Sequence, residues 1–334
     1  MARHRIAKLL ALSLLVVFSF SLCAQAAEVK WKMATKMPPA SPEGKAFQMF
    51  ADLVKKKSQG KMEMVVFPAE QLGKTDAALE QLQAGVIQIY PEGSGYLKKF
   101  VDDIKYTSLP FLFTSREHWV KVMDSDMVQN WLKEIAQKQN IIVLGKITDF
   151  VRGPYRVMVS KKPVNTLAQL QGLKLRLHPD DVAIATWKYL GASCIVLPWT
   201  EIYEGLGRGI VQACNAPIAQ VEAMKFYEQA KYIIRNDEYP QGMAFMTNRK
   251  AFDSLKPELK KSVLDAHKEA CAYSEKIMGQ VADDSIARMK KKGVQYSMLE
   301  RKPFVDRLNE LYQKWEAEKK LPAGFLKNVR ALAD

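Results

Sequence analysis

Arg176 and His178 are the residues best placed for chemistry, because they lie on and directly after a predicted strand at residues 173–177. A cation held on a strand keeps its geometry, and a guanidinium offers two parallel N–H donors that match a carboxylate. The pair therefore indicates an anion-binding site. His118 and His267 lie in sequence of helical pattern, where a packed or surface histidine is the simpler interpretation.

Motifs of the common enzyme classes are absent from the sequence. There is no G-x-S-x-G elbow, P-loop, H-E-x-x-H pair or G-x-G-x-x-G turn. The glycine cluster at 205–209 lacks the spacing and the preceding strand that phosphate binding needs. Neighbouring aspartates at 180–181 and 283–284 most simply cap or decorate helices. We therefore expect no catalytic residue and no enzyme activity.

Three cysteines lie beyond residue 26: Cys194, Cys214 and Cys271. They show no C-x-x-C spacing and have no neighbouring pair of histidines, so no metal site or cofactor is predicted. Buried free thiols are the expected state. A bond between Cys194 and Cys214 stays open at this point.

The first 26 residues have the pattern of a cleavable export signal. Three cations precede an apolar run at 9–22, and a small-residue cleavage site follows at 24–26. The run is shorter than the roughly 20 residues of a membrane-spanning helix. A retained anchor and lipidation at Cys23 are less favoured, so we expect cleavage before Ala27 and export to the periplasm.

The chain has 334 residues, is 48% hydrophobic and has a formal net charge of +14, which fits one large or two medium globular domains. Without residues 1–26, 47 Lys and Arg would face 36 Asp and Glu, a net +11. The lysine runs at 55–57 and 290–292 lie on helix faces, and no basic stripe is interleaved with aromatics. The expected partner is therefore an acidic small molecule and not nucleic acid.

Hydrophobic periodicity predicts short strands alternating with longer helices, which is typical of an α/β protein. The predicted strands are 28–35, 62–67, 86–90, 140–147, 155–160, 173–177, 192–197, 210–215, 232–234 and 242–247. The predicted helices are 42–58, 75–84, 117–139, 180–190, 200–206, the segment from Pro217 to 229, and 257–292.

The last predicted helix is long enough to connect two lobes. At 1.5 Å per residue, 257–292 would extend for about 54 Å, more than the width of one domain. The segment 148–154 is predicted to cross between the lobes. We expect lobe I to comprise 27–150 and about 242–281, and lobe II to comprise 151–241 and about 282–334. Two α/β lobes, an export signal and no reactive cluster suggest a receptor that closes on a solute.

Several segments, taken in order, resemble the solute receptors of tripartite ATP-independent periplasmic (TRAP) transporters, the DctP-like family. Each is weak alone, but their order and spacing together are specific. They are Lys55 to Lys61, Pro68 to Gly73, Arg156, Gly172 to Leu177, Pro198 to Tyr203, Leu206 to Pro217, and Lys225 to Glu228.

The resemblance implies a two-lobed α/β receptor with crossing hinge strands and a long helix that spans both lobes. It closes on an organic carboxylate and delivers it to membrane permease subunits that an ion gradient drives. Arg176 is then the partner of the carboxylate, Arg156 a second donor, and Trp199 an aromatic wall of the pocket. The other residues predicted to bind the ligand are Asn215, His178, Glu201, Thr75 and Lys36.

Two departures from the family pattern bear on the ligand. Asn215-Ala216-Pro217 stands where sugar-acid receptors have Glu-Asn-Pro, and Lys74-Thr75 replaces an acidic pair found in some relatives. Both changes remove partners for hydroxyls, so they favour a compact or partly apolar mono- or dicarboxylate over sialic or uronic acids. A dicarboxylate would need a second cation, for which Lys36, Lys74, Arg152 and His178 are the candidates.

Two other function classes stay open at this stage. An exported enzyme could use Glu201 or His178 as a base on a small anionic substrate. A periplasmic interaction protein could act without any ligand. The sequence predicts a monomer without a cofactor, and it does not identify the ligand.

Overall fold

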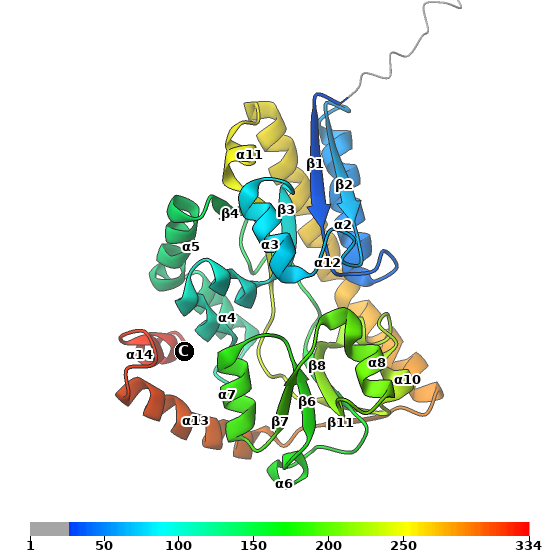
Figure 1. Ribbon diagram of the computed structural model, residues 1–334, viewed down its shortest axis with the longest axis vertical. Coiled ribbons are helices and arrows are strands. Elements are labelled where there is room, and N and C mark those ends of the chain that lie inside the picture. The colour runs from blue at the N-terminus through cyan, green and yellow to red at the C-terminus, as the bar shows by residue number, and fades with distance from the viewer. Residues whose placement is uncertain (1–26, 334) are drawn as a thin grey trace, which may run out of the picture.

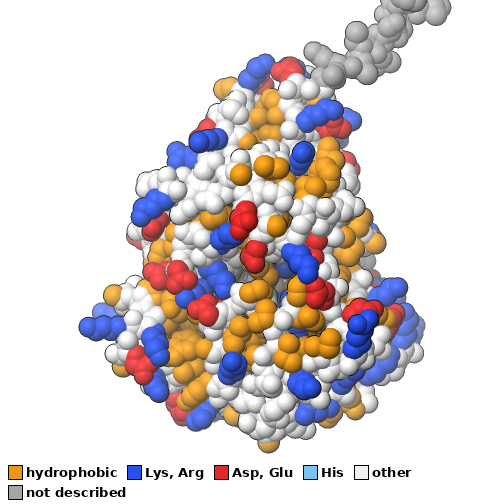
Figure 2. Space-filling model, in the orientation of Figure 1, with side chains coloured by type: hydrophobic (Ala, Val, Ile, Leu, Met, Phe, Trp, Pro, Cys, Tyr) orange, Lys and Arg blue, Asp and Glu red, His pale blue; other side chains and the backbone are white. Residues whose placement is uncertain are grey.

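The computed structural model describes residues 27–333 and has two α/β lobes, one above the other in Figure 1. The predicted export signal at residues 1–26 lies outside the described residues. On the face seen in Figure 2, lysine and arginine side chains are interspersed with aspartate and glutamate and form no continuous stripe. Among the described residues, none of the helices combines the length and apolar character needed to cross a membrane.

Lobe I, the upper lobe, is built on a five-stranded sheet with the order β2-β1-β3-β10-β4. β1 pairs in parallel with β2 and β3, whereas β10 is antiparallel to β3 and β4. The strands are β1 (Val29–Ala34), β2 (Met62–Phe67), β3 (Ile89–Gly93), β4 (Ile141–Val143) and β10 (Met243–Asn248). The helices are α2 (Pro42–Lys57), α3 (Thr75–Ala84), η1 (Ser94–Lys99), η2 (Asp102–Ser108), α4 (Arg116–Met123), α5 (Asp126–Lys138) and α11 (Arg249–Asp253).

Lobe II has a six-stranded sheet with the order β11-β9-β5-β8-β6-β7. β6 pairs in parallel with β7 and β8, and β5 is antiparallel to β8 and β9. The strands are β5 (Arg156–Ser160), β6 (Lys174–Leu177), β7 (Ser193–Val196), β8 (Ala213–Pro217), β9 (Tyr232–Arg235) and β11 (Gln295–Met298). The helices are α6 (Leu167–Leu170), α7 (Asp181–Tyr189), η3 (Trp199–Glu201), α8 (Ile202–Gly207), α9 (Ile218–Val221) and α10 (Phe226–Gln229).

Three segments connect the lobes: residues 144–155, residues 236–242 and the long helix α12 (Pro257–Lys291). α12 packs against α2 in lobe I and against α9 and β11 in lobe II. Val151 and Gly242 join the two extended segments in an isolated antiparallel bridge, and the Val151 N–H donates to Ser274 Oγ of α12 at 3.1 Å. The predicted two-lobed fold with crossing strands and a spanning helix is therefore confirmed.

The C-terminal helices α13 (Arg301–Ala317) and α14 (Phe325–Ala331) link lobe II to α4 of lobe I. α13 packs against α7 and α14. The Tyr312 hydroxyl donates to the Pro110 carbonyl at 2.7 Å, and His118 Nε2 donates to the Val329 carbonyl at 2.8 Å. His118 is thus a packed core histidine, as its helical sequence predicts.

Most predicted elements are present, and the differences have local causes. The strand 62–67 and the helix 75–84 match the prediction, whereas the predicted strand 86–90 lies at 89–93. The predicted helix 117–139 is two helices, because Ser125 begins a new one after α4 ends at Met123. The segment from Pro217 to 229 is likewise interrupted, at Lys225 in left-handed conformation. Cys194, Cys214 and Cys271 are all free thiols.

Gly242 lies where the two extended crossing segments meet. A Cβ atom at this position would lie 2.1 Å from the Ile147 carbonyl oxygen and 2.8 Å from the Trp119 ring. The next residue, Met243, donates its N–H to the same Ile147 carbonyl at 3.0 Å. The two backbones therefore approach too closely for any residue other than glycine at position 242.

We expect Gly242→Ala to lower the free energy of unfolding by about 1–3 kcal/mol, because the added methyl group must displace backbone. Gly279→Ala is the matched control. Gly279 lies inside α12, where an added Cβ would meet no heavy atom of a neighbouring element within 4 Å, so alanine there should raise stability by about 0.5–1 kcal/mol. Urea unfolding followed by circular dichroism measures both changes. Equal effects of the two substitutions would contradict the close approach at the hinge.

His267 is a buried, uncharged core group of α12. Its ring contacts Phe245 edge to face at a centroid distance of 4.6 Å, and it is 3% exposed. Burial lowers the pKa of His267 to about 4, against a smaller opposing effect of the Asp149 charge. The folded chain therefore resists protonation that the unfolded chain accepts.

This histidine predicts an acid-sensitive stability. Between pH 6.5 and pH 4 the unfolded chain binds the proton and the folded chain does not, so the free energy of unfolding falls as the pH falls through this range. The full loss from this group is about 3 kcal/mol. His267→Phe keeps an aromatic ring and should flatten the decline in urea unfolding experiments between pH 7 and pH 4.5. An unchanged decline in this variant would assign the pH dependence to other groups.

Candidate functional site

A cavity of about 50 Å³ lies between the lobes, beside the crossing segments. Lobe I contributes residues from β3, η1 and the end of β1, and lobe II contributes residues from β5, β6 and β8 and from the loops that follow them. The lining includes Lys36, Glu92, Ser94, Tyr96, Ser108, Arg152, Arg156, Arg176, His178, Asp180, Trp199, Asn215, Glu238, Tyr239 and Gln241. The structure therefore brings together six of the predicted ligand-binding residues: Arg176, Arg156, Trp199, Asn215, His178 and Lys36.

Arg176 occupies a central strand of lobe II. β6 lies between β8 and β7, and Arg176 is in register with Cys214 and Ile195 of these neighbours. Its Nε donates to the Leu197 carbonyl at 2.7 Å, its guanidinium lies 5.8 Å from the Trp199 ring centre, and it is 5% exposed. Within residues 27–333 no carboxylate pairs with it. Burial accordingly lowers the pKa of Arg176, the direction expected for a cation without a compensating charge.

Arg156, by contrast, already has an ionic partner. Its Nε donates to Glu238 Oε2 at 2.9 Å and its Nη1 to Gln241 Oε1 at 2.7 Å. The other oxygen of Glu238 accepts from Trp187 Nε1 at 2.7 Å and from Asn215 Nδ2 at 3.1 Å. Arg156 is 7% exposed and belongs to a buried hydrogen-bonded network.

A second buried network lies on the lobe I side of the cavity. Lys36 Nζ is 2.6 Å from Glu92 Oε2, and Arg152 Nη1 donates to Glu92 Oε1 at 3.0 Å. Arg152 also forms a two-pronged pair with Glu43 at 2.9 and 3.1 Å. Both cations of this network are therefore neutralised by carboxylates.

His178 and Asp180 form a third polar pair at the N-terminus of α7. His178 Nε2 lies 3.3 Å from Asp180 Oδ2, and the His178 ring packs against Tyr96 of lobe I at 5.5 Å. Asp180 caps α7 by accepting from the N–H groups of Val182 and Ala183, both at 3.0 Å. Burial opposes ionisation of Asp180, but the hydrogen bond and charge of His178, the Lys98 charge and the cap hold its pKa at about 2.

Trp199 lies against the cations of both lobes. Lys36 Nζ is 5.6 Å from its ring centre, and the Arg176 guanidinium is at a similar distance. Phe226 packs edge to face against the same ring at 5.2 Å. Trp199 therefore lines the interlobe cavity, and its predicted role as an aromatic wall for a ligand stays a prediction.

Glu201 and Thr75 lie outside this cavity. Glu201 forms an ion pair with Lys74 across the mouth of the cleft, and Thr75 Oγ1 accepts from the Tyr90 hydroxyl at 3.0 Å. Thr75 and Lys74 line an adjoining pocket of about 130 Å³, which shares Lys36, Tyr96, Arg176 and Trp199 with the main cavity.

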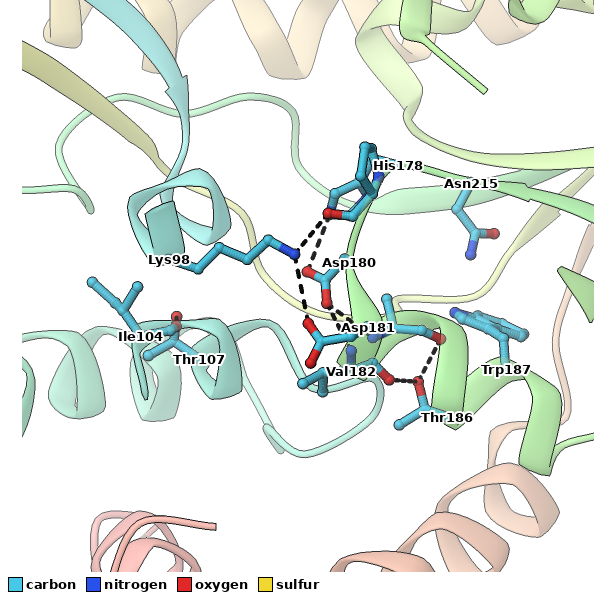
Figure 3. Close-up of polar contacts among 12 residues, drawn as sticks. Lys98, Ile104, Thr107, His178, Asp180, Asp181, Val182, Thr186, Trp187 and Asn215 are labelled. Carbon is cyan, nitrogen blue, oxygen red and sulfur yellow. Dashed lines mark hydrogen bonds and ion pairs between the residues drawn. The ribbon is translucent and has the colours of Figure 1, made fainter. Parts of the chain in front are cut away.

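Polar contacts between the lobes close both ends of the cleft. On one side Thr200 Oγ1 donates to Glu70 at 2.7 Å, next to the pair of Lys74 and Glu201. On the other side Lys98 of η1 reaches the start of α7, where it donates to the Pro179 carbonyl at 2.6 Å and lies 3.6 Å from Asp181 (Figure 3). These contacts join the two lobes across the cleft on both sides of the cavity.

The acids and hydroxyls of the cavity are not among the residues predicted from the sequence. Glu92 and Glu238 balance the cations, and Ser94, Ser108 and Tyr96 complete the lobe I wall. Glu238 lies in the segment between the predicted strands 232–234 and 242–247. An acidic residue in a segment that crosses between the lobes was the signal in the sequence that could have identified it. In the described part of the chain no cluster of His, Cys, Asp and Glu could hold a metal ion.

Comparison with known proteins gives the family. The model of the family described as bacterial extracellular solute-binding protein, family 7 (DctP), matches residues 33–319. The 2,3-diketo-L-gulonate-binding periplasmic protein YiaO of Escherichia coli is 29% identical, over 79% of this chain and 79% of that protein.

Two solved structures share the fold. The TRAP periplasmic solute-binding protein of Actinobacillus succinogenes with bound L-galactonate is 25% identical with a TM-score of 0.82, covering 91% of this chain and 99% of that one. The TRAP protein of Ochrobacterium anthropi with bound L-fuconate is 24% identical with a TM-score of 0.83, covering 92% and 100%. The resemblance found in the sequence is confirmed. The chain belongs to family 7 of the bacterial extracellular solute-binding proteins, the DctP family.

Proposed function

We propose that the chain is the periplasmic solute receptor of a TRAP transporter and binds the carboxylate of an organic acid at Arg176. The observation that carries the proposal is a buried guanidinium that faces the interlobe cavity without a carboxylate partner in the described chain. Removing a charge from water costs several kcal/mol unless a counter-charge is supplied. A bound carboxylate supplies it, and two parallel N–H···O bonds suit this pair of groups.

The balance of charges favours a monocarboxylate. Lys36 and Arg152 share Glu92, and Arg156 pairs with Glu238. Lys74 pairs with Glu201, and His178 pairs with Asp180. Each cation considered for a second ligand carboxylate is thus already engaged, so a dicarboxylate would have to displace an internal partner.

Hydroxyl groups opposite Arg176 favour a ligand with oxygen beyond its carboxylate. Ser94 and Ser108 line the cavity from lobe I, and within residues 27–333 neither side chain has a hydrogen-bond partner. A hydroxyl or keto group on the ligand could accept from or donate to them. We therefore propose a compact hydroxy or keto monocarboxylate. This chemistry overlaps with the sugar acids named for YiaO and the Actinobacillus protein.

The cellular setting follows from the same proposal. The family consists of solute-binding proteins and not of enzymes. The chain would reach the periplasm through the signal at residues 1–26, act as a monomer and hand the acid to membrane permease subunits. The lobes that move would be 27–150 with about 242–281 and 151–241 with about 282–334.

A ligand screen tests this function. Thermal unfolding should shift upward with compact hydroxy and keto monocarboxylates, because a ligand that binds only the folded state stabilises it by mass action. A ligand present at about 100 times its Kd contributes about 2.7 kcal/mol. The matching alcohols without the carboxylate are the controls and should give no shift. A wide acid library that leaves the melting temperature unchanged would remove the support for a receptor.

Substitutions at the two cavity arginines separate binding from stability. Arg176→Ala removes the carboxylate partner, so affinity should fall about 30-fold to several thousand-fold, with Arg176→Lys between it and the wild type. The melting temperature of ligand-free Arg176→Ala should equal or exceed that of the wild type, since the substitution removes a buried charge without a carboxylate partner in the described chain and breaks no ion pair. Arg156→Ala leaves Glu238 buried without its cation and should lower stability by about 3–5 kcal/mol.

Isothermal titration with an acid found in the screen, together with thermal unfolding of each variant, measures these effects. Binding by Arg176→Ala within threefold of the wild type would make Arg176 a structural residue. An unchanged stability of Arg156→Ala would contradict the assigned network.

A further inference from the structure

A second cavity, of about 280 Å³, lies on the other side of the hinge segments. Arg152, Arg156, Pro217, Tyr239 and Gln241 line both this rear cavity and the interlobe cavity. The remaining wall comes from the start of α4, the residues before β5, the end of β9 with the segment that follows it, and the start of α13. The rear cavity is therefore bounded by both lobes and by the segments that join them.

The rear cavity has more positive than negative charge. Arg116, Arg235 and Arg301 line it, and Asp237 is its only carboxylate among the described lining residues. Arg152 and Arg156 are not available to a further anion, because Glu43 and Glu92 already neutralise Arg152 and Glu238 neutralises Arg156. The three other guanidiniums therefore face a single acid.

Each of these arginines keeps donors that no described residue uses. Arg235 directs Nε at both oxygens of Asp237, each at 3.0 Å, and its two terminal nitrogens have no hydrogen-bond acceptor in the described chain. Arg116 gives one terminal nitrogen to the Thr148 carbonyl at 3.0 Å. Arg301 has only the Phe111 ring, 5.7 Å from its guanidinium, and its Nε is buried without a partner.

An unpaired buried donor on a cation is costly, and here it lies beside two other guanidiniums at a cavity large enough for a small ion. Arg116 and Arg301 are also the first residues of α4 and α13, so the positive ends of two helix dipoles lie at the wall of this cavity. Both observations point to a negatively charged occupant.

We propose that the rear cavity binds a small divalent oxyanion, with Arg301, Arg235 and Arg116 as its ligands. Guanidiniums bind such groups through paired, charge-assisted hydrogen bonds, and two of the three would balance a charge of −2. Arg116 comes from lobe I and Arg235 from lobe II, so the anion connects the lobes behind the hinge. None of these three arginines lines the interlobe cavity that contains Arg176.

Sulfate is the probe, and isothermal titration at constant ionic strength is the measurement. The titration uses the Arg176→Ala chain, so that sulfate cannot report on the interlobe site. We expect one sulfate per chain with a Kd of roughly 1 mM or tighter. Adding Arg301→Gln should weaken sulfate binding at least tenfold, and Arg116→Gln should weaken it to a smaller or similar degree.

Arg330→Gln is the matched control, because Arg330 is exposed on α14 and its loss changes the net charge by the same amount. This variant should bind sulfate like its parent. Absence of saturable binding in the Arg176→Ala chain would overturn the proposal, and so would equal losses in Arg301→Gln and Arg330→Gln. Since Arg301 has no hydrogen-bond partner to lose within residues 27–333, thermal unfolding of Arg301→Gln should match the parent in sulfate-free buffer.

Discussion

The cost of burying charge governs the centre of this molecule. Cations and carboxylates between the lobes are largely buried. Each of these charges lowers the stability of the fold by several kcal/mol unless an opposite charge pairs with it. Glu92 and Glu43 satisfy Arg152, and Glu238 satisfies Arg156. In the described chain Arg176 is left with a backbone carbonyl and an aromatic ring only. In the proposed function, specificity for a carboxylate arises from this one missing negative charge.

The fold places this unpaired cation where closure can use it. β6 is held between β7 and β8, so Arg176 is on a rigid strand and not on a loop. The opposite wall belongs to lobe I, which is joined to lobe II by extended segments and α12. In this structure Lys98 contacts the start of α7 and Thr200 contacts Glu70, so the lobes meet around the pocket. Electrostatic attraction for the acid is strongest in this state, because the effective dielectric constant is lowest there.

Local sequence patterns predicted the elements well and the charge pairing poorly. Helix 75–84 has a regular apolar face and ends at Gly85, which adopts the left-handed conformation with φ of 79°. Strand β4 is shorter than predicted because Gly145, with φ of 60°, turns the chain soon after Val143. Arg156 and Glu238 are 82 positions apart, and no periodicity reports a contact at that separation. Trp199 and Arg176 were predicted through the family pattern and line the interlobe cavity, whereas Glu201 matches the pattern and yet lies at the rim. Thr75, at a position that departs from the pattern, also lies outside this cavity.

The most direct measurement of the central claim is a structure of the chain with its acid bound. The account predicts both carboxylate oxygens within hydrogen-bonding distance of the Arg176 guanidinium, about 2.7–2.9 Å, while Glu238 keeps Arg156 and Glu92 keeps Lys36. A ligand whose carboxylate rests on Lys36 or Arg156, with their internal acids displaced and Arg176 untouched, would contradict it.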